Sequence, residues 1–241
     1  MNTTDSNKTE GETSRQYVYR ILKGEIMSWK RLPGELLNDT QISAQLGVSR
    51  TPVREALFML KEDRLVTIYA RNKTVVSLID WSLIEEGKFV RTALETLVAS
   101  ELCGNIPADV IGELSENLAL QRNLAEGNCG RTSFFDLDNE FHHILYRASG
   151  KEHTYKMVRR MCYQVDRVRY YMIPRANLIQ NMMRSHQSIL KYITDGDRDK
   201  LTAVLTQHIN DVFDSDGKPA TFAVGLFKTH PEYFSNAPSC L

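Results

Sequence analysis

Long apolar runs are missing from this sequence, and none approaches the roughly 18 consecutive residues that a membrane-spanning helix needs. The polar start from Met1 to Thr13 also lacks the apolar stretch of a secretory signal. We therefore expect a cytoplasmic protein that does not associate with a membrane. The 4 cysteines form no C-x-x-C pair, so the sequence indicates neither a disulfide framework nor a thiolate zinc site, and we expect free thiols.

A net charge is missing as well, because 30 basic residues balance 30 acidic residues over 241 positions. The balance differs along the chain. Between Arg15 and Asp80 there are 11 basic and 7 acidic residues, a local charge of +4, so the remainder is slightly acidic. This asymmetry favours a basic module that binds a polyanion, joined to a neutral or acidic module.

The basic region carries the pattern of three helices followed by a β-hairpin. The helices are predicted at Ser14–Lys23, at Asp39–Leu46 and from Ser49 onward, and the strands at Leu65–Tyr69 and Lys73–Ser77. Gly24 breaks the first helical pattern, and Asp39 and Ser49 are suitable N-caps for the other two helices. Residues 14–79 are therefore predicted to form a winged helix-turn-helix, preceded by a disordered segment, residues 1–13.

Two arginines near the start of the third helix are the candidate nucleic-acid contacts. Arg50 and Arg54 are four residues apart, so both project from one exposed helix face. A recognition helix presents its N-terminal residues to base edges in the major groove, where arginine can grip guanine with two hydrogen bonds. Ser49 and Thr51 add hydroxyl groups suited to phosphate oxygens. The alternative is that the arginines only solvate the surface, with Arg54 paired to Glu55 or Glu62.

The run LGVSRTPVREAL, preceded by LPGELL, resembles the DNA-binding domain of the GntR family of bacterial transcription regulators. The resemblance implies that Arg50, Thr51 and Arg54 contact operator DNA. It also implies that the hairpin tip at Asn72 is a wing that enters the adjacent minor groove. Two positions depart from the family pattern: Thr40 stands where an arginine is frequent, and Asn72 stands where glycine is usual.

Beyond Asp80 the sequence shows long helical patterns and no convincing strand. Helices are predicted at Trp81–Glu101, Pro107–Ala125, Arg131–Ser149, Glu152–Met172, Asn177–Thr194 and Arg198–Phe213. Residues 80–214 are therefore predicted to form an all-helical bundle. The tail, residues 215–241, has no helical period and stays unassigned.

Three histidines of this second region are expected to face inward: two fall on apolar helix stripes, where an aliphatic residue is expected, and His142 flanks the stripe of its helix. They are His142, His186 and His208, and Asp138 lies one turn before His142 on the same inward side. Each histidine alone is more simply a hydrogen-bonded core residue. Together, three inward imidazoles and one carboxylate could supply an N₃O ligand set for a divalent transition metal.

Two arginines also fall on inward stripes. Arg91 and Arg169 need carboxylate partners if they are buried. One interpretation pairs Arg91 with Glu95 one turn later, and Arg169 with Asp166 or another acid. The other interpretation is that both arginines bind an anionic small molecule that also coordinates the metal.

Several motifs of the second region resemble the ligand-binding domain of the FadR subfamily, known as the FCD domain. The motifs are V-R-x-x-L-E from Val90, D-x-x-F-H from Asp138, D-R-V-R from Asp166, and the histidines His186 and His208. The resemblance implies that Asp138, His142, His186 and His208 are metal ligands and that Arg91 lines an effector pocket. The implied metal is zinc, with nickel or manganese as alternatives, and the implied effectors are small organic acids.

These features together predict a mainly α-helical, homodimeric, one-component transcriptional regulator, in the usual case a repressor. A winged helix would read half of a pseudo-palindromic operator in double-stranded DNA, and the helical domain would sense a carboxylate metabolite over the metal. One rival is a metal-dependent hydrolase, although no well-placed general base is evident. A second rival is a winged-helix DNA binder whose metal is purely structural.

Overall fold

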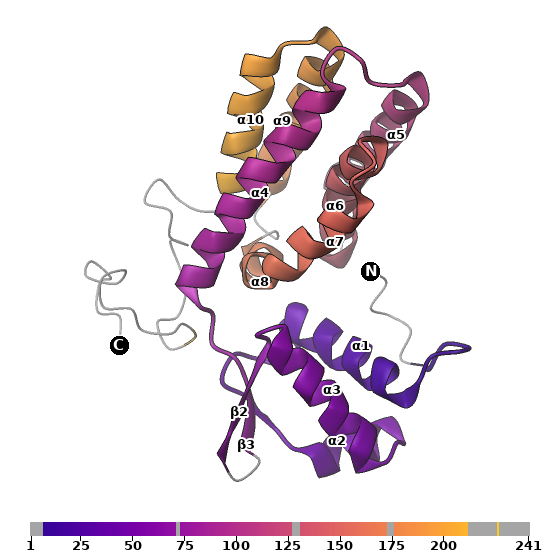
Figure 1. The fold of residues 1–241 in the computed structure, drawn as a ribbon, viewed down its shortest axis with the longest axis vertical. Helices are drawn as coiled ribbons and strands as arrows, with labels where there is room; N and C mark the ends of the chain where they lie inside the picture. The colour runs from indigo at the N-terminus through magenta and orange to yellow at the C-terminus, as the bar shows by residue number, and fades with distance from the viewer. Residues whose placement is uncertain (1–6, 71–72, 127–130, 173–175, 212–225, 227–241) are drawn as a thin grey trace, which may run out of the picture. The chain divides into compact units, whose positions relative to one another are not determined.

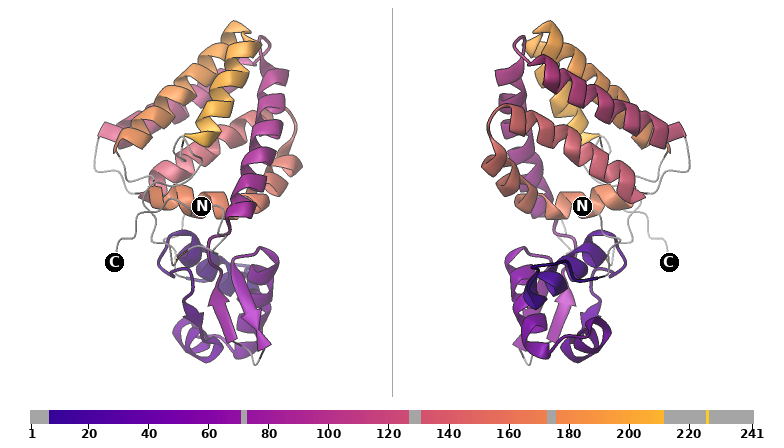
Figure 2. Two further views of the ribbon diagram at one scale, coloured as in Figure 1. Left: turned by 90° about the vertical axis from the view of Figure 1, so that its left-hand side faces the viewer. Right: turned by 90° about the vertical axis from the view of Figure 1, so that its right-hand side faces the viewer.

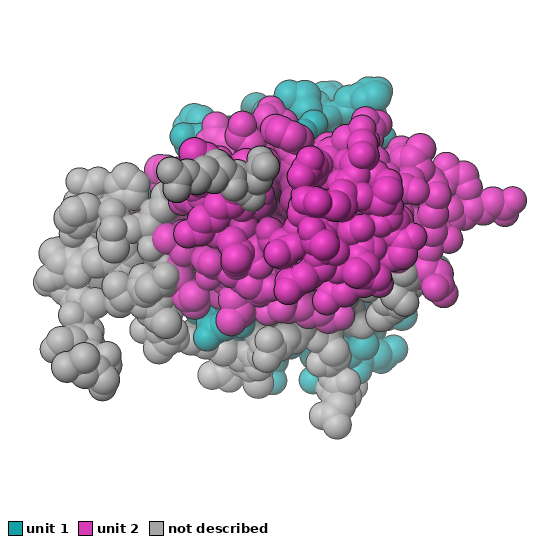
Figure 3. Space-filling model, turned by 90° about the horizontal axis from the view of Figure 1, so that it is seen from below, with its two compact units in different colours: residues 1–2, 85–220 teal, residues 3–84, 221–241 magenta. Residues whose placement is uncertain are grey.

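The computed structural model describes residues 7–70, 73–126, 131–172, 176–211 and 226 of the chain. Within these ranges the secondary structure is mostly helical, with ten helices and three short strands (Figure 1, Figure 2). The chain divides into two compact units. Unit 1 comprises residues 1–2 and 85–220, and unit 2 comprises residues 3–84 and 221–241 (Figure 3). The predicted mainly α-helical class is confirmed.

Unit 2 contains the predicted winged helix-turn-helix. Its elements are α1 (Ser14–Met27), β1 (Leu36–Leu37), α2 (Asp39–Leu46), α3 (Arg50–Glu62), β2 (Val66–Tyr69) and β3 (Lys73–Val76). The strands form one antiparallel sheet in the order β1-β3-β2. Strand β1 was not predicted, because two residues are too few to show an alternating pattern. Gly47 has a φ of 64°, which glycine adopts without strain, and it makes the tight turn between α2 and α3.

Helix α1 is longer than its sequence pattern predicts. It continues past Gly24 to Met27, because Val18, Leu22 and Ile26 form one buried stripe on α3. Burying an isoleucine side chain contributes about 1.5–3 kcal/mol, which outweighs the cost of about 1 kcal/mol for glycine inside a helix. The prediction that Gly24 ends the helix was therefore wrong.

The segment before α1 makes more contacts than expected. Thr13 caps α1 in a capping box, and Arg20 forms an ion pair with Glu12 at 2.8 Å. These contacts fix the end of the segment 1–13, which was expected to be disordered throughout. Residues 1–6 lie outside the described part of the chain.

The caps of the two helices around Gly47 also differ from the prediction. Asn38, not Asp39, caps α2, and its side chain accepts hydrogen bonds from the N–H groups of the next turn. Ser49 is the N-cap residue of α3, but its hydroxyl makes no capping hydrogen bond. Asp39 is the first residue of α2, so its carboxylate is available for other partners.

Unit 1 is all-helical within the described ranges, and the first of its helices begins four residues earlier, in unit 2. Its helices are α4 (Trp81–Leu102), α5 (Ala108–Glu126), α6 (Arg131–Ala148), α7 (Glu152–Met161), α8 (Tyr163–Met172), α9 (Ala176–Asp195) and α10 (Arg198–Asn210). Helix α5 packs against both α6 and α9, and α9 packs against α10 (Figure 1). This arrangement brings the inward faces of α6, α9 and α10 toward one another.

Helices α7 and α8 replace the single helix predicted from Glu152 to Met172. The break falls at Cys162, the C-cap of α7. Helix α7 exposes Met157 and Met161, whereas every residue from Tyr163 to Arg169 in α8 is buried. One straight helix cannot expose one half and bury the other on all sides, so the chain changes direction there.

The remaining predictions concern membrane spans, the cysteines and the C-terminal tail. Every described helix is too short or too polar to span a bilayer. Cys103 and Cys162 are free, buried thiols, whereas Cys129 and Cys240 lie outside the described residues. So does the tail, residues 215–241, apart from Leu226, whose carbonyl accepts a hydrogen bond from the N–H of Ile79 at 3.0 Å.

Candidate metal centre and nucleic-acid interface

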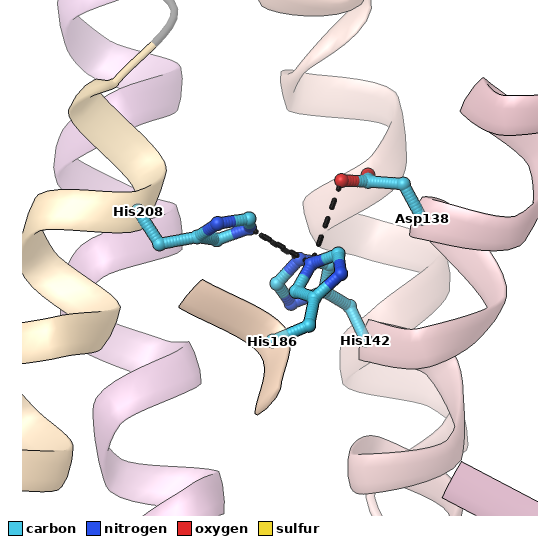
Figure 4. Close-up of side chains that lie close together, drawn as sticks. All are labelled: Asp138, His142, His186 and His208. Atoms are coloured by element: carbon cyan, nitrogen blue, oxygen red, sulfur yellow. Dashed lines mark hydrogen bonds and ion pairs between the residues drawn. The ribbon is translucent and has the colours of Figure 1, made fainter. Parts of the chain in front are cut away.

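The four predicted metal ligands lie together in the interior of unit 1 (Figure 4). Asp138 and His142 come from α6, His186 from α9 and His208 from α10, and all four are buried. One potential ligand atom of each residue lies within 4.8 Å of the others. The helical periodicity therefore predicted correctly that these four side chains face inward.

The spacing of the ring nitrogens suits a shared metal ion. The Nε2 atom of His208 is 3.0 Å from Nε2 of His142 and 3.2 Å from Nε2 of His186. Two nitrogens about 2.0–2.1 Å from one Zn²⁺ are about 2.9 Å apart at a right angle and about 3.4 Å apart at the tetrahedral angle. The observed separations fall in this range.

A neighbouring side chain fixes the proton position on one of the rings. Nδ1 of His186 lies 2.9 Å from Oε1 of Gln121 on α5, and Nδ1 of His142 lies 2.8 Å from Oε2 of Glu95 on α4. The amide oxygen of Gln121 can only accept, so Nδ1 of His186 carries the proton and its Nε2 presents a lone pair toward the cluster. The contact of His142 with Glu95 is close enough for an ion pair, but Nδ1 of His142 makes no hydrogen bond within the described residues.

The carboxylate oxygen that Asp138 would offer to a metal also lacks a hydrogen-bond donor. Oδ1 of Asp138 is buried, lies 3.6 Å from Nε2 of His186, and accepts no hydrogen bond from the described residues. Several lone pairs therefore point at one buried region, an arrangement that costs free energy unless a cation occupies it. The residues fit a divalent transition metal.

Burial and charge keep this cluster ready to bind a cation. Burial lowers the pKa of His186 to about 3 and lowers the pKa of His208 well below its usual value. Burial alone would raise the pKa of Asp138, but Arg169 and the neighbouring histidines together outweigh burial and hold that pKa well below its usual value. At neutral pH His186 and His208 are therefore neutral imidazoles and Asp138 is an ionised carboxylate, the forms that bind metals.

The two predicted effector arginines are buried against protein carboxylates. Nε of Arg91 donates to Glu95 at 2.7 Å. Arg169 donates to Asp138, and to Asp166 at 3.1 Å. The expected pairs with Glu95 and Asp166 are therefore present. Each arginine is also connected to a predicted metal ligand, Arg91 through Glu95 and Arg169 directly.

On unit 2, the recognition-helix residues Ser49, Arg50, Thr51 and Arg54 are all exposed. The partner of Arg54 differs from the two acids considered under the alternative in which it only solvates the surface. Its Nε donates to Asp39 on α2 at 2.8 Å, and not to Glu55 or Glu62. Asn72, at the predicted tip of the wing, lies outside the described residues.

Three partners were missed as functional residues. Glu95 was considered only as the partner of Arg91, although it also contacts His142. Gln121 and Asn117 interrupt the buried stripe of α5 with two amides, and Gln121 donates to Asn117 at 2.6 Å. Polar residues at core positions of a helix were the signal that could have identified them.

A winged helix-turn-helix joined to an all-helical domain is the make-up of a DNA-binding transcriptional regulator. The family model described as "Bacterial regulatory proteins, gntR family" matches residues 14–76, and the model of the FCD domain matches residues 89–211. The chain belongs to the GntR family and carries an FCD domain. Regulators of this family bind operator DNA and are not enzymes. FCD domains often bind a metal ion, and the buried cluster could hold one.

Similar proteins support this assignment over most of their length. The chain is 30% identical to an HTH-type transcriptional regulator in an unstable DNA locus of Streptomyces ambofaciens, covering 92% of this chain and 93% of the relative. It is 29% identical to the HTH-type transcriptional repressor RspR of Escherichia coli K12, covering 88% and 93%. The solved structure of E. coli McbR/YncC has the same fold, with a TM-score of 0.68 at 19% identity over 83% of this chain and 95% of that one.

Proposed function

We propose that the protein is a homodimeric transcriptional repressor whose operator binding is controlled by a small organic acid bound over a divalent metal. The observation that carries this proposal is the convergence of buried ligand atoms from Asp138, His142, His186 and His208, all within 4.8 Å of one another. Zinc is the first candidate metal, with nickel or manganese as alternatives, because three imidazoles and one carboxylate suit these ions. Repression, rather than activation, of transcription is favoured by the similarity to RspR, which is named as a repressor.

In unit 2, Arg50 and Arg54 would read bases in the major groove, with Ser49 and Thr51 on phosphates and Asn72 at the tip of a minor-groove wing. The exposure of both arginines on one face of α3 supports this role. Operator reading by two copies requires a half-site spacing that matches the separation of the two winged helices. A change in that separation would change the affinity for the operator.

The charges around the metal centre favour an anionic effector. Arg91, Arg159 and Arg169 form ion pairs with Glu95, Asp138 and Asp166, so these side chains balance one another. A divalent ion would add two positive charges that no side chain in this set compensates. A dicarboxylate would neutralise them, with one carboxylate on the metal and Arg91 and Arg169 nearby. A bound metal would supply the Lewis acid for that carboxylate.

Metal analysis combined with thermal unfolding tests this proposal. The purified protein would be analysed for bound metals and then melted with a panel of di- and tricarboxylates, with and without a chelator. About one metal per chain, and an acid that stabilises only the metal-loaded protein, is the expected result. A protein that binds no metal and whose melting ignores chelator and acids alike would refute both parts of the proposal.

A second candidate is a DNA binder whose metal is structural. The observation in its favour is that Arg91 and Arg169 already have carboxylate partners, so neither needs an external anion. In that case the metal would raise the melting temperature, but no acid would add stability or change operator affinity. The same melting experiment separates the two candidates.

A further inference from the structure

One carboxylate holds both arginines of the recognition helix. An NH₂ group of Arg50 lies 3.0 Å from each carboxylate oxygen of Asp39, and Nε of Arg54 lies 2.8 Å from Oδ2 of the same residue. Asp39 is the first residue of α2, and α2 packs against α3. Because Asn38 provides the helix cap, the carboxylate of Asp39 is not needed for capping.

The two arginines donate to the carboxylate of Asp39 through different nitrogen atoms. Arg54 donates through Nε, at the inner edge of its guanidinium group, so this bond leaves the two terminal amino groups unused. Those two groups form the fork that matches O6 and N7 of guanine. Arg50 instead uses a terminal nitrogen, so its own fork is partly occupied. The geometry therefore distinguishes two arginines that look equivalent in the sequence.

The charge of Asp39 also matters near DNA. Hydrogen bonds from Arg54 and then Arg50 lower the pKa of Asp39, so the carboxylate is ionised at neutral pH. An ionised carboxylate close to the phosphate backbone reduces affinity for any DNA sequence. This loss of affinity is offset only on DNA sequences where the arginines oriented by Asp39 make good base contacts.

We propose that Asp39 is a specificity-determining residue that orients Arg54 for a two-hydrogen-bond contact with guanine and weakens binding to other sequences. This inference rests on the proposed operator-reading role of Arg50 and Arg54. Their side chains are 51% and 52% exposed, so the ion pairs contribute little to folding. Asp39→Asn should therefore fold like the wild type, which thermal unfolding verifies before any binding is measured.

The experiment uses the full-length protein and a duplex selected with it from a random-sequence library. Dissociation constants would be measured for this duplex, for single-base-pair variants of it, and for an unrelated duplex. The proteins compared are the wild type, Arg54→Ala, Asp39→Asn, Asp39→Glu and Glu55→Gln. Glu55 is an exposed acid on α3, so its variant removes the same charge without touching Arg54.

Asp39→Asn should reduce discrimination at the guanine read by Arg54 by about 5- to 10-fold, because an unsupported arginine makes a weaker two-bond contact. It should also tighten binding to the unrelated duplex by about 2- to 5-fold at low salt. Asp39→Glu should retain more discrimination than Asp39→Asn. Glu55→Gln should leave base preference unchanged.

Failure of the inference can be distinguished from failure of the proposed function. If Arg54→Ala keeps the wild-type base preference, Arg54 does not read bases, and the proposed role of the recognition helix is wrong. If Arg54→Ala loses that preference while Asp39→Asn keeps it, only the inference about Asp39 is wrong. A base pair that depends on Arg54 but contains no guanine at the contacted position would overturn the inference as well.

Discussion

Gln121→Met is the most informative single change at the candidate metal centre. Oε1 of Gln121 accepts the Nδ1 proton of His186 at 2.9 Å, which directs the lone pair of Nε2 toward the cluster. Methionine keeps the length and apolar volume of the side chain but removes the acceptor. The histidine could then rotate or carry its proton on Nε2, and either change competes with metal binding.

The expected loss follows from the position of Gln121 behind a ligand. Removing such a partner lowers metal affinity by about 10- to 100-fold. With metal in excess over both dissociation constants, the metal-loaded variant should lose about 1.4–2.7 kcal/mol of unfolding free energy beyond the loss in the chelated variant. The chelated variant itself should lose about 1–3 kcal/mol, because buried polar groups near Gln121 are left without partners.

Two measurements separate the loss of metal affinity from the loss of stability that is independent of the metal. A competition titration against a metal-binding dye gives the dissociation constant, and urea unfolding with and without chelator gives the two stabilities. Asn123→Met is the matched control, because residue 123 is exposed on the same helix. An unchanged metal affinity in Gln121→Met would show that the ring orientation of His186 does not depend on this hydrogen bond.

Three further changes test the ligands and the fold. In the chelated protein, the pKa of His186 is about 3 and that of His208 is well below its usual value, because both are buried, whereas both titrate near about 6.5 when unfolded. The unfolded state then binds more protons, so the unfolding free energy should decrease by about 1.4 kcal/mol per pH unit for each group as the pH is lowered from about 6.5. Equal stability at about pH 7 and pH 5.5 would contradict this. His208→Ala should greatly reduce the metal retained after dialysis, and elemental analysis at the wild-type stoichiometry would exclude His208 as a required ligand. Ile26→Ala should cost about 2–5 kcal/mol in urea unfolding, and a loss under about 1 kcal/mol would mean that this end of α1 is not part of the core.

Periodicity predicted the helices and the inward ligands because both depend on local patterns. His186 and His208 could be placed in the interior from their own helices alone. The same method failed at Gly24 and Cys162, where the outcome depends on what packs around the helix. Burial of Ile26 extends α1 past a glycine, and the burial of every residue from Tyr163 to Arg169 accompanies a helix break at Cys162 that no glycine or proline marks in the sequence.

Interactions between helices were the least predictable part of the site. The sequence indicated that Arg91 and Arg169 need acids, but not that Glu95 also contacts His142 or that Arg169 contacts Asp138. Asp39 is another example, because its link to α3 depends on how two helices cross. Such contacts depend on relative helix positions, which no single-helix pattern contains.

The most direct test of the proposed regulation is the operator affinity of the metal-loaded protein with and without the acid that stabilises it. We expect the acid to change the dissociation constant by at least about 10-fold, within the usual range of coupling between two sites. The chelated protein should show no such change. Operator affinity that stays the same with every stabilising acid would contradict the claim that this metal centre controls DNA binding.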